Sequence, residues 1–264
     1  MTVEEPSAFL SLPSALPREE VEAALSRHDD WFYEFVFSNG AATRTHGELL
    51  RTLHLTKPRL ILPFLDGYFR GRWGGIECLD MACHQGWFSI QTAMRGARRV
   101  HGVDVRREHV ERAELIRDLA GLGNTTFEQS NLFDLDPDRD GRYDLTLFLG
   151  ILYHLDAPVR ALTLARALTK ELCVIETQVA RPTPDMEYLW GSDPGVRTGH
   201  AIAVGRVGER HVAEGTEVVL VPTLEALCYL LQAAGFQSLS LAIPPPGSHD
   251  QYRELDRVVV FAGV

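Results

Sequence analysis

The chain has 264 residues, of which 45% are hydrophobic and 23% are charged, a composition that is typical of a folded globular protein and excludes a wholly disordered one. Its 26 basic and 36 acidic residues give a formal net charge of −10. This balance argues against a protein that coats nucleic acid, because affinity for phosphate backbones comes largely from Lys and Arg.

The N-terminus and the cysteines indicate a cytoplasmic protein. Glu4 and Glu5 stand where a secretion signal needs positive charge, and no long apolar core follows them. The longest apolar run, residues 145–152, is far shorter than the ~18 residues that cross a bilayer. The four cysteines are widely spaced and predict neither a disulfide framework nor a metal site. We therefore expect a cytoplasmic, reduced, soluble protein without a membrane partner.

Residues 1–75 predict an N-terminal helical and aromatic extension, which would act as a lid or lie on the substrate side. A helix is predicted over 18–27. An aromatic cluster follows it and fits a core better than a stacking platform, although it could also roof a binding site: Trp31, Phe32, Tyr33, Phe35 and Phe37. Tyr33 is our candidate from this cluster for a contact with substrate.

The segment 44–72 is a local exception to the acidic balance, with six basic residues against two acidic ones, a net of +4 (6 − 2). A solvated helix face is the simplest explanation of such a segment. Contact with a cofactor or an acceptor is the alternative.

Short apolar runs alternate with segments of helical period from residue 76 to residue 177, which predicts βαβ units and a parallel sheet. Asp156 is predicted to cap a helix that holds Pro158 in its first turn. The predicted strands of this block lie over 76–81, 99–105, 125–129, 144–149 and 172–177, and its other helices over 87–95 and 108–120.

The C-terminal part begins with an insertion over 180–221 and continues with a predicted helix over 223–234. Two strands, over 238–243 and 257–261, follow without a helix between them and should pair antiparallel. The whole pattern predicts an α/β fold: a seven-stranded, mostly parallel sheet with helices on both faces and an antiparallel C-terminal hairpin.

The most informative segment is LDMACHQGWF, residues 79–88. A strand carries Asp80 near its end, and a short turn of small residues opens a helix whose N-terminus offers unpaired N–H groups. The second strand ends near Asp104, 24 residues later (104 − 80). An acidic side chain there suits a ribose diol. Together with Gly86 and the terminal hairpin, these residues predict a nucleoside-cofactor site rather than a generic turn.

With these residues the chain resembles the class I S-adenosylmethionine-dependent methyltransferases, from about residue 75 to the C-terminus. The more specific likeness is to the branch that contains the tRNA wobble-uridine carboxymethyltransferase. The resemblance implies a Rossmann-like domain over 76–264 and S-adenosyl-L-methionine as cofactor. The motifs are LDMACHQGWFSI, FLGILYHLDAP, VIET and VPTLEALCYLLQAAGF.

The resemblance also implies a role for each residue near the cofactor. The loop would face the methionine part of the cofactor, with Asp80, Ala82, Cys83, His84 and Gly86. At the end of the second strand, Asp104 and Val105 would lie at the ribose, and after strand three Asn131 and Leu132 would lie at the adenine. Leu149 and Tyr153, around the end of strand four, would line the cofactor on the acceptor side. The family usually has glycines where this chain has Ala82 and His84, so either the loop bends differently or His84 has a role.

Acceptor-side residues follow from position. His154 is the candidate general base, with bracing of the following loop as its alternative role. Glu176, at the end of strand five, is predicted to be a satisfied carboxylate. The insertion should lie over the acceptor site and offers Trp190 and His200 as substrate contacts. Its alternatives are a surface excursion or a contact in a homo-oligomer.

The sequence thus predicts a methyltransferase that acts on an oxygen or nitrogen atom of a small molecule, in natural-product biosynthesis. The acidic charge and the aromatic insertion favour this reading. A tRNA wobble-uridine (carboxy)methyltransferase-like enzyme is the alternative. A third reading, a non-catalytic cofactor-binding protein, is supported only by His84.

Overall fold

The computed structural model describes residues 10–45, 48–181, 201–206 and 218–264. Two compact units make up the chain and are described separately. The first is Met1–Asp134 with Ile243–His249, and the second is Leu135–Ala242 with Asp250–Val264.

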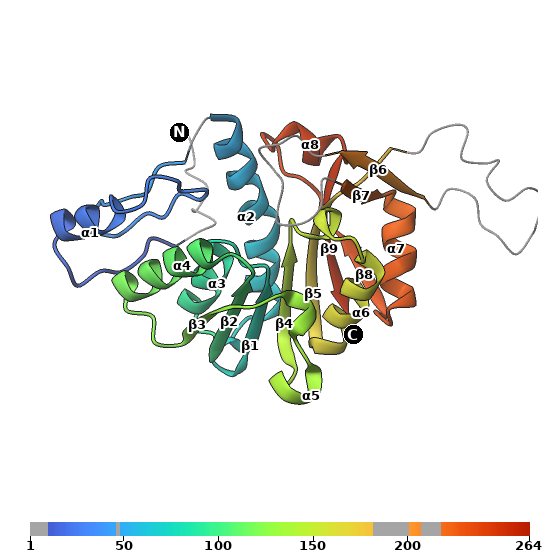
Figure 1. Ribbon diagram of the computed structural model, residues 1–264, viewed down its shortest axis with the longest axis horizontal. Coiled ribbons are helices and arrows are strands. Elements are labelled where there is room, and N and C mark those ends of the chain that lie inside the picture. Colours follow the sequence, from blue (N-terminus) through green and yellow to red (C-terminus); the bar gives the residue numbers. More distant parts are fainter. Residues whose placement is uncertain (1–9, 46–47, 182–200, 207–217) are drawn as a thin grey trace, which may run out of the picture. The chain divides into compact units, whose positions relative to one another are not determined.

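The central sheet has seven strands in the order β3-β2-β1-β4-β5-β9-β8 (Figure 1). The pairings β1–β2, β2–β3 and β4–β5 are parallel, whereas β9 pairs antiparallel with both β5 and β8. The predicted mostly parallel sheet with an antiparallel C-terminal hairpin is therefore confirmed. Its strands are β1 Glu77–Met81, β2 Arg99–Asp104, β3 Thr125–Gln129, β4 Tyr143–Leu149, β5 Thr169–Gln178, β8 Ser238–Leu241 and β9 Arg257–Gly263.

In the first unit, α3 (Trp87–Met94) packs against β1 and β2, and α4 (Arg107–Ala120) packs against β2 and β3. Four of the five residues of β1 are buried, as expected for a parallel strand covered on both faces. Gly121 ends α4 in the left-handed conformation, close to the predicted end of this helix at residue 120. A 3₁₀ turn, η2 (Leu132–Asp134), follows β3.

The N-terminal part of this unit holds α1 (Arg18–Leu25), α2 (Glu48–Tyr68) and the turn η1 (Trp73–Gly75). Two glutamine side chains tie its loops to the start of the sheet domain. Gln85 Oε1 accepts from the N–H of Phe32 at 2.9 Å, and Gln85 Nε2 donates to the carbonyl of Asp30 at 2.9 Å. Gln91 makes the same pair of bonds with the backbone of Leu10. Each side-chain amide therefore pairs with backbone N–H and carbonyl groups of an irregular segment that has no neighbouring strand to bond with.

Most of the aromatic cluster is buried, whereas most of the basic residues in the segment that follows it are exposed. Trp31, Tyr33, Phe35 and Phe37 are buried, as predicted for core residues. Arg44, Arg51, Arg70 and Arg72 are exposed, but Lys57 is only 6% exposed. The expectation of a solvated helix face is therefore wrong for Lys57, because the side of α2 that carries Lys57 is buried within the first unit.

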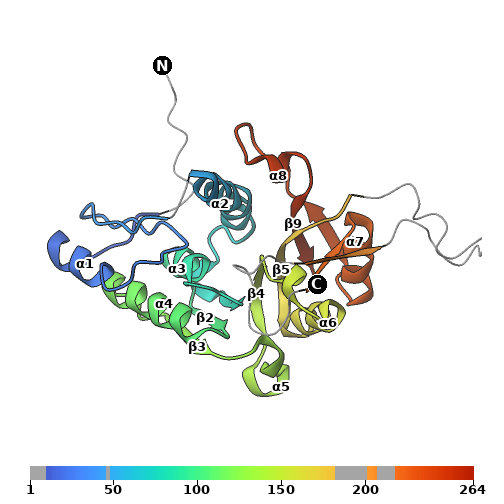
Figure 2. The ribbon, with the colours of Figure 1, turned by 45° about the horizontal axis from the view of Figure 1, so that its top comes forward.

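In the second unit, α6 (Pro158–Leu168) packs against β4 and β5 and lies beside α7 (Leu224–Ala233) (Figure 2). Thr223 caps α7, since its hydroxyl accepts from the N–H of Ala226 at 3.2 Å. The predicted cap of α6 is wrong: Ala157 occupies the N-cap without a side-chain bond, and Asp156 lies one residue outside. Proline disfavours the helical region for the residue before it, which makes Ala157, with φ −123° and ψ 61°, the last non-helical position. Two short helices, α5 (Pro137–Asp140) and α8 (Asp250–Arg253), complete this unit.

The insertion contains an antiparallel pair that the sequence did not predict, β6 (Ile202–Arg206) with β7 (Val218–Pro222). Strand β7 packs against η3 (Leu152–His154), the turn that follows β4. Trp190 and His200 lie outside the described residues. Within the described ranges, no helix is long and apolar enough to cross a membrane.

Candidate functional site

The loop between β1 and α3 has the backbone of a glycine loop although two of its residues are not glycine. Ala82, His84 and Gly86 have φ angles of 60°, 52° and 74°. The left-handed region costs a residue with a Cβ atom on the order of 1 kcal/mol. The structure therefore has two strained residues in this loop, Ala82 and His84, where glycine would be relaxed.

Gly86 is required by packing as well as by its φ angle. A Cβ atom at Gly86 would lie 2.6 Å from Cζ of Phe127 and 2.9 Å from Cβ of Ala113. A Cβ atom at Gly102 would lie 2.6 Å from Cδ1 of the same Phe127. The two glycines thus admit the Phe127 ring from β3, a contact that the sequence did not reveal.

Asp80 is buried in this loop region, with only 3% of its surface exposed. Its Oδ2 accepts a hydrogen bond from Oγ of Ser89 at 2.6 Å. Burial raises the pKa of Asp80 to about 7, an effect that the Ser89 hydrogen bond and the charge of Lys57 oppose and that the Asp104 charge reinforces. Asp80 is therefore partly protonated near neutral pH.

Asp104, at the end of β2, is held by three hydrogen bonds within the unit. Its Oδ2 accepts from the N–H of His84 at 2.8 Å, and its Oδ1 accepts from the N–H of Arg106 at 3.0 Å and from Nδ1 of His109 at 3.1 Å. Burial raises the pKa of Asp104, but the hydrogen bonds from His109 and Arg106 outweigh it and leave the pKa below its ordinary value. Asp104 is a fixed carboxylate.

Imidazole and aromatic rings gather around His84. Its ring stacks on His109 with centroids 3.7 Å apart and lies 4.6 Å from the ring of Phe32. His54 lies 4.2 Å from Phe32 and 4.8 Å from Tyr33. Burial and the neighbouring His109 hold the pKa of His84 well below its ordinary value. Nδ1 of His84 is buried and has no hydrogen-bond partner among the residues that the structure describes.

Other predicted residues of this unit lie near the ends of their strands. Cys83 is buried, and burial raises the pKa of its thiol well above the ordinary value, so that it stays neutral. Val105 is 43% exposed although it is apolar. Asn131 is exposed, and its Oδ1 accepts from the N–H of Phe133 at 3.0 Å, whereas Leu132 is buried.

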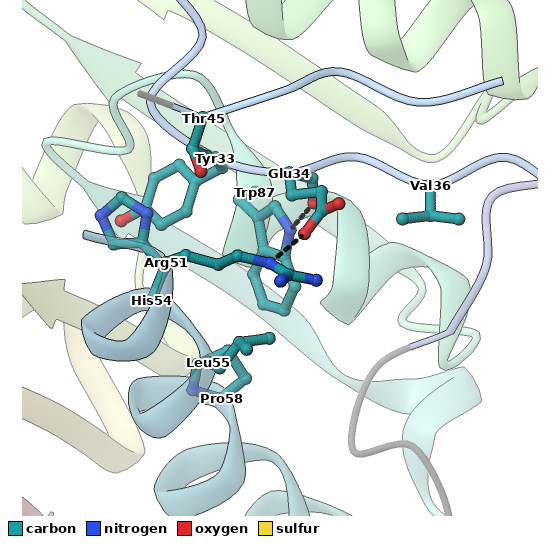
Figure 3. Close-up of a pocket in the computed structure, with 9 residues that line it drawn as sticks. All are labelled: Tyr33, Glu34, Val36, Thr45, Arg51, His54, Leu55, Pro58 and Trp87. Carbon is teal, nitrogen blue, oxygen red and sulfur yellow. Dashed lines mark hydrogen bonds and ion pairs between the residues drawn. The ribbon is translucent and has the colours of Figure 1, made fainter. Parts of the chain in front are cut away.

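A small cavity of about 30 Å³ lies beside the aromatic cluster (Figure 3). The guanidinium of Arg51 bonds the Glu34 carboxylate there at 3.4 Å, and Nε1 of Trp87 donates to the Glu34 carbonyl at 3.0 Å. Such a volume is about that of a single water. Its walls include the predicted substrate residue Tyr33, and the full lining is Tyr33, Glu34, Val36, Thr45, Arg51, His54, Leu55, Pro58 and Trp87.

In the second unit, a buried polar network fixes the turn after β4. Oε1 of Glu176 accepts from the hydroxyl of Tyr252 and from Nη1 of Arg257, each at 2.8 Å. Nη2 of Arg257 donates to the hydroxyl of Tyr153 at 3.2 Å. Glu176 is therefore bonded through Oε1 near the end of β5, which agrees for that oxygen with the prediction of a satisfied strand-end carboxylate.

The predicted base and its neighbours are accessible on this turn. Leu149, Tyr153 and His154 are each half-buried. The rings of Tyr153 and His154 lie 4.2 Å apart, so the network that fixes Tyr153 also limits the motion of His154.

A larger cavity of the second unit, about 560 Å³, was not predicted. Arg181 lies in its wall and pairs with Glu254 and Asp256 at 2.7 Å. The volume falls in the range of small-molecule sites. The signal that could have revealed it is the position of Arg181 just beyond the fifth strand. Its lining is Val179, Ala180, Arg181, Leu224, Glu225, Glu254 and Leu255.

Comparison with known proteins identifies the domain. Residues 74–188 match the family model described as a methyltransferase domain. No curated protein matches the sequence. The matched stretch contains strands β1 to β5 and is similar to methyltransferase domains, and the seven-stranded sheet described above is of the Rossmann-like kind.

Solved structures share the fold at low sequence identity. The crystal structure of the N-terminal domain of EvdMO1 with SAH bound has a TM-score of 0.69 and 19% identity, over 98% of this chain and 100% of that one. The magnesium protoporphyrin IX methyltransferase of Synechocystis PCC 6803 with bound SAH has a TM-score of 0.56 and 16% identity, over 84% and 89% of the two chains. The 1,6-didemethyltoxoflavin-N1-methyltransferase of Burkholderia thailandensis has a TM-score of 0.51 and 18% identity, over 76% and 75%.

Proposed function

We propose that this protein transfers a methyl group from S-adenosylmethionine to an oxygen or nitrogen atom of a small molecule, in natural-product biosynthesis. The observation that carries the proposal is the fixed carboxylate of Asp104 at the end of β2, beside a loop of left-handed backbone that opens α3. A strand-end carboxylate of this kind suits a ribose, and the loop lets a ligand approach the backbone. The methyltransferase domain and the SAH bound in structures of the same fold support the cofactor.

The residues of the first unit fit a nucleoside-bearing cofactor. Asp104 stays ionised because its hydrogen bonds hold its pKa low, so it can accept from a ribose hydroxyl. Val105 offers exposed apolar surface, and Asn131 an exposed amide, at the ends of the neighbouring strands. These residues would hold the ribose and the adenine, and the loop around Asp80 and Ala82 would face the methionine part.

When bound, S-adenosylmethionine supplies a methyl group that is already activated by its sulfonium charge. The protein then needs mainly to align the acceptor atom, because proximity and orientation supply much of the acceleration. His154 would take a proton from an acceptor hydroxyl or ammonium group. Arg257 would keep the neighbouring Tyr153 in place through its hydrogen bond.

An open groove of about 560 Å³ at the surface of the second unit gives room for a small acceptor, with apolar groups from Val179, Leu224 and Leu255 and the exposed charged groups of Arg181 and Glu254. Proteins of the same fold include methyltransferases whose names give a porphyrin and a toxoflavin precursor as substrates. A tRNA acceptor has less support, because the net charge is −10 and Lys57, one of the six basic residues of segment 44–72, is buried.

Two measurements test this proposal. Isothermal titration with S-adenosylhomocysteine should show saturable binding of one molecule per chain, and a chain that shows none would contradict the cofactor. Transfer of a labelled methyl group should then be screened on small molecules with hydroxyl or amino groups and, separately, on bulk tRNA. Methylation of tRNA alone would overturn the choice of acceptor.

A further inference from the structure

We propose that His84 is a second ribose contact, which shares the hydroxyl groups of the cofactor with Asp104. This inference rests on the proposed function and assigns the His84 side chain to the ribose, whereas the resemblance implies that its loop faces the methionine part of the cofactor. It follows from the number of hydrogen bonds that Asp104 already accepts and from the buried, unpartnered Nδ1 of His84.

The Asp104 carboxylate has little capacity left for a diol. A carboxylate offers about four lone-pair positions on its two oxygens. Oδ1 is filled by the N–H of Arg106 and by Nδ1 of His109, and Oδ2 accepts from the N–H of His84. One position on Oδ2 therefore remains, whereas a ribose brings two hydroxyl groups. The second hydroxyl needs another partner.

His84 is suited to be that partner. Its backbone N–H is bonded to Oδ2 of Asp104, so His84 adjoins the oxygen that has the remaining acceptor position. Its Nδ1 is buried without a partner in the described part of the chain. A buried polar atom left unpaired costs free energy, and a ligand hydroxyl would remove that cost. A hydroxyl both donates and accepts, so it can pair with either tautomer of a neutral imidazole.

The loop accepts strain at His84, and packing fixes its ring. A φ angle of 52° is uncommon for a residue with a Cβ atom, although histidine and asparagine adopt it more often than most, and glycine would avoid its cost. The ring is held between His109, at 3.7 Å, and Phe32, at 4.6 Å, which restricts its orientation. A strained residue with a fixed polar side chain is the arrangement expected of a ligand contact.

The test compares S-adenosylhomocysteine with 5′-methylthioadenosine, which has the same ribose and adenine but lacks the amino-acid part. Isothermal titration of both ligands is made with the wild-type chain, His84→Gly and His84→Asn. His84→Gly should weaken the binding of both ligands by a similar factor of about 3- to 10-fold, the loss expected for one hydrogen bond. His84→Asn should recover most of this loss, because asparagine tolerates the left-handed region and carries polar atoms at the branch point.

Ala82→Gly is the matched reference, because it relaxes a left-handed residue of the same loop without removing a polar group. The loss in His84→Gly should exceed the loss in Ala82→Gly, and thermal denaturation should show that all variants are folded. Equal binding by wild type and His84→Gly would overturn the inference, as would a loss for S-adenosylhomocysteine alone or a failure of asparagine to restore binding. A wild-type chain that binds neither ligand would instead overturn the proposed function, and this inference with it.

Discussion

The imidazole rings of His84 and His109 stack with their centroids 3.7 Å apart and an angle of 27° between their planes, and both residues bond to the carboxylate of Asp104. One bond comes from the backbone of His84 and the other from the ring of His109. The stacked rings and the shared carboxylate of Asp104 thus connect the loop after β1 to the first turn of α4.

Asp80 should make the stability of the protein depend on pH. Its pKa is about 7 in the folded state, whereas an unperturbed aspartate has a pKa of 3.8. The folded state therefore holds the proton that the unfolded state has lost between these values, and stability should fall as pH rises through this window, by at most about 1.4 kcal/mol per pH unit. Urea unfolding of wild type and Asp80→Asn at several pH values checks this. The variant should lack the dependence, and parallel curves for the two proteins would contradict the assignment.

Gly86→Ala should destabilise the first unit, because the new methyl group meets Phe127 and the φ angle is 74°. Overpacking costs about 1–3 kcal/mol, and the left-handed backbone adds about 1–2 kcal/mol. Denaturant unfolding measures the sum. Gly102→Ala, which meets the same ring, isolates the packing cost. If Phe127→Leu does not relieve part of the loss in a double variant with Gly86→Ala, the packing explanation fails.

Glu176→Gln should be strongly destabilising, by about 3–5 kcal/mol, because it leaves the buried Arg257 without its ionic partner. Glu254→Gln is the matched control, since it weakens a pair between the same residue types, Arg181 with a glutamate, at the exposed surface. Chemical denaturation should show little change for the control. A comparable change in the two variants would mean that burial does not set the cost.

His154→Gln tests the base. We expect the dissociation constant for S-adenosylhomocysteine to be unchanged and turnover on an identified acceptor to fall by roughly 10²- to 10⁴-fold, because glutamine forms hydrogen bonds but cannot take the proton. Steady-state kinetics and a thermal melt of the same preparation separate chemistry from folding. Turnover near that of wild type in a folded variant would leave His154 the role of bracing the turn after β4.

The strands and helices with buried positions could be predicted from the sequence, because the spacing of apolar residues is visible within each segment. Residues 125–129 form β3, and residues 108–120 lie in α4, both as predicted. The sequence missed what depends on contacts between distant residues. The fit of Gly86 and Gly102 around Phe127 is one example, and the stack of His84 on His109 is another.

The remaining differences have local causes that the pattern concealed. The β6–β7 pair is short and lies within an insertion rich in Gly and Pro, so its apolar residues gave no clear period. Lys57 is buried although its sequence neighbourhood is basic, because burial is set by how α2 packs. The candidate carboxylates Asp80 and Asp104 were identified from their strand-end positions, but their different protonation could not be predicted without their hydrogen-bond partners.

Binding of S-adenosylhomocysteine by wild type and Asp104→Asn tests the central claim most directly. Loss of a charged acceptor should cost about 1.5–3 kcal/mol, which raises the dissociation constant roughly 10- to 150-fold. Thermal denaturation controls for folding, since Asp104 also receives the three bonds described above. Isothermal titration that shows this loss in a folded variant would support a ribose site at the end of β2. An unchanged dissociation constant in a folded Asp104→Asn variant would contradict it.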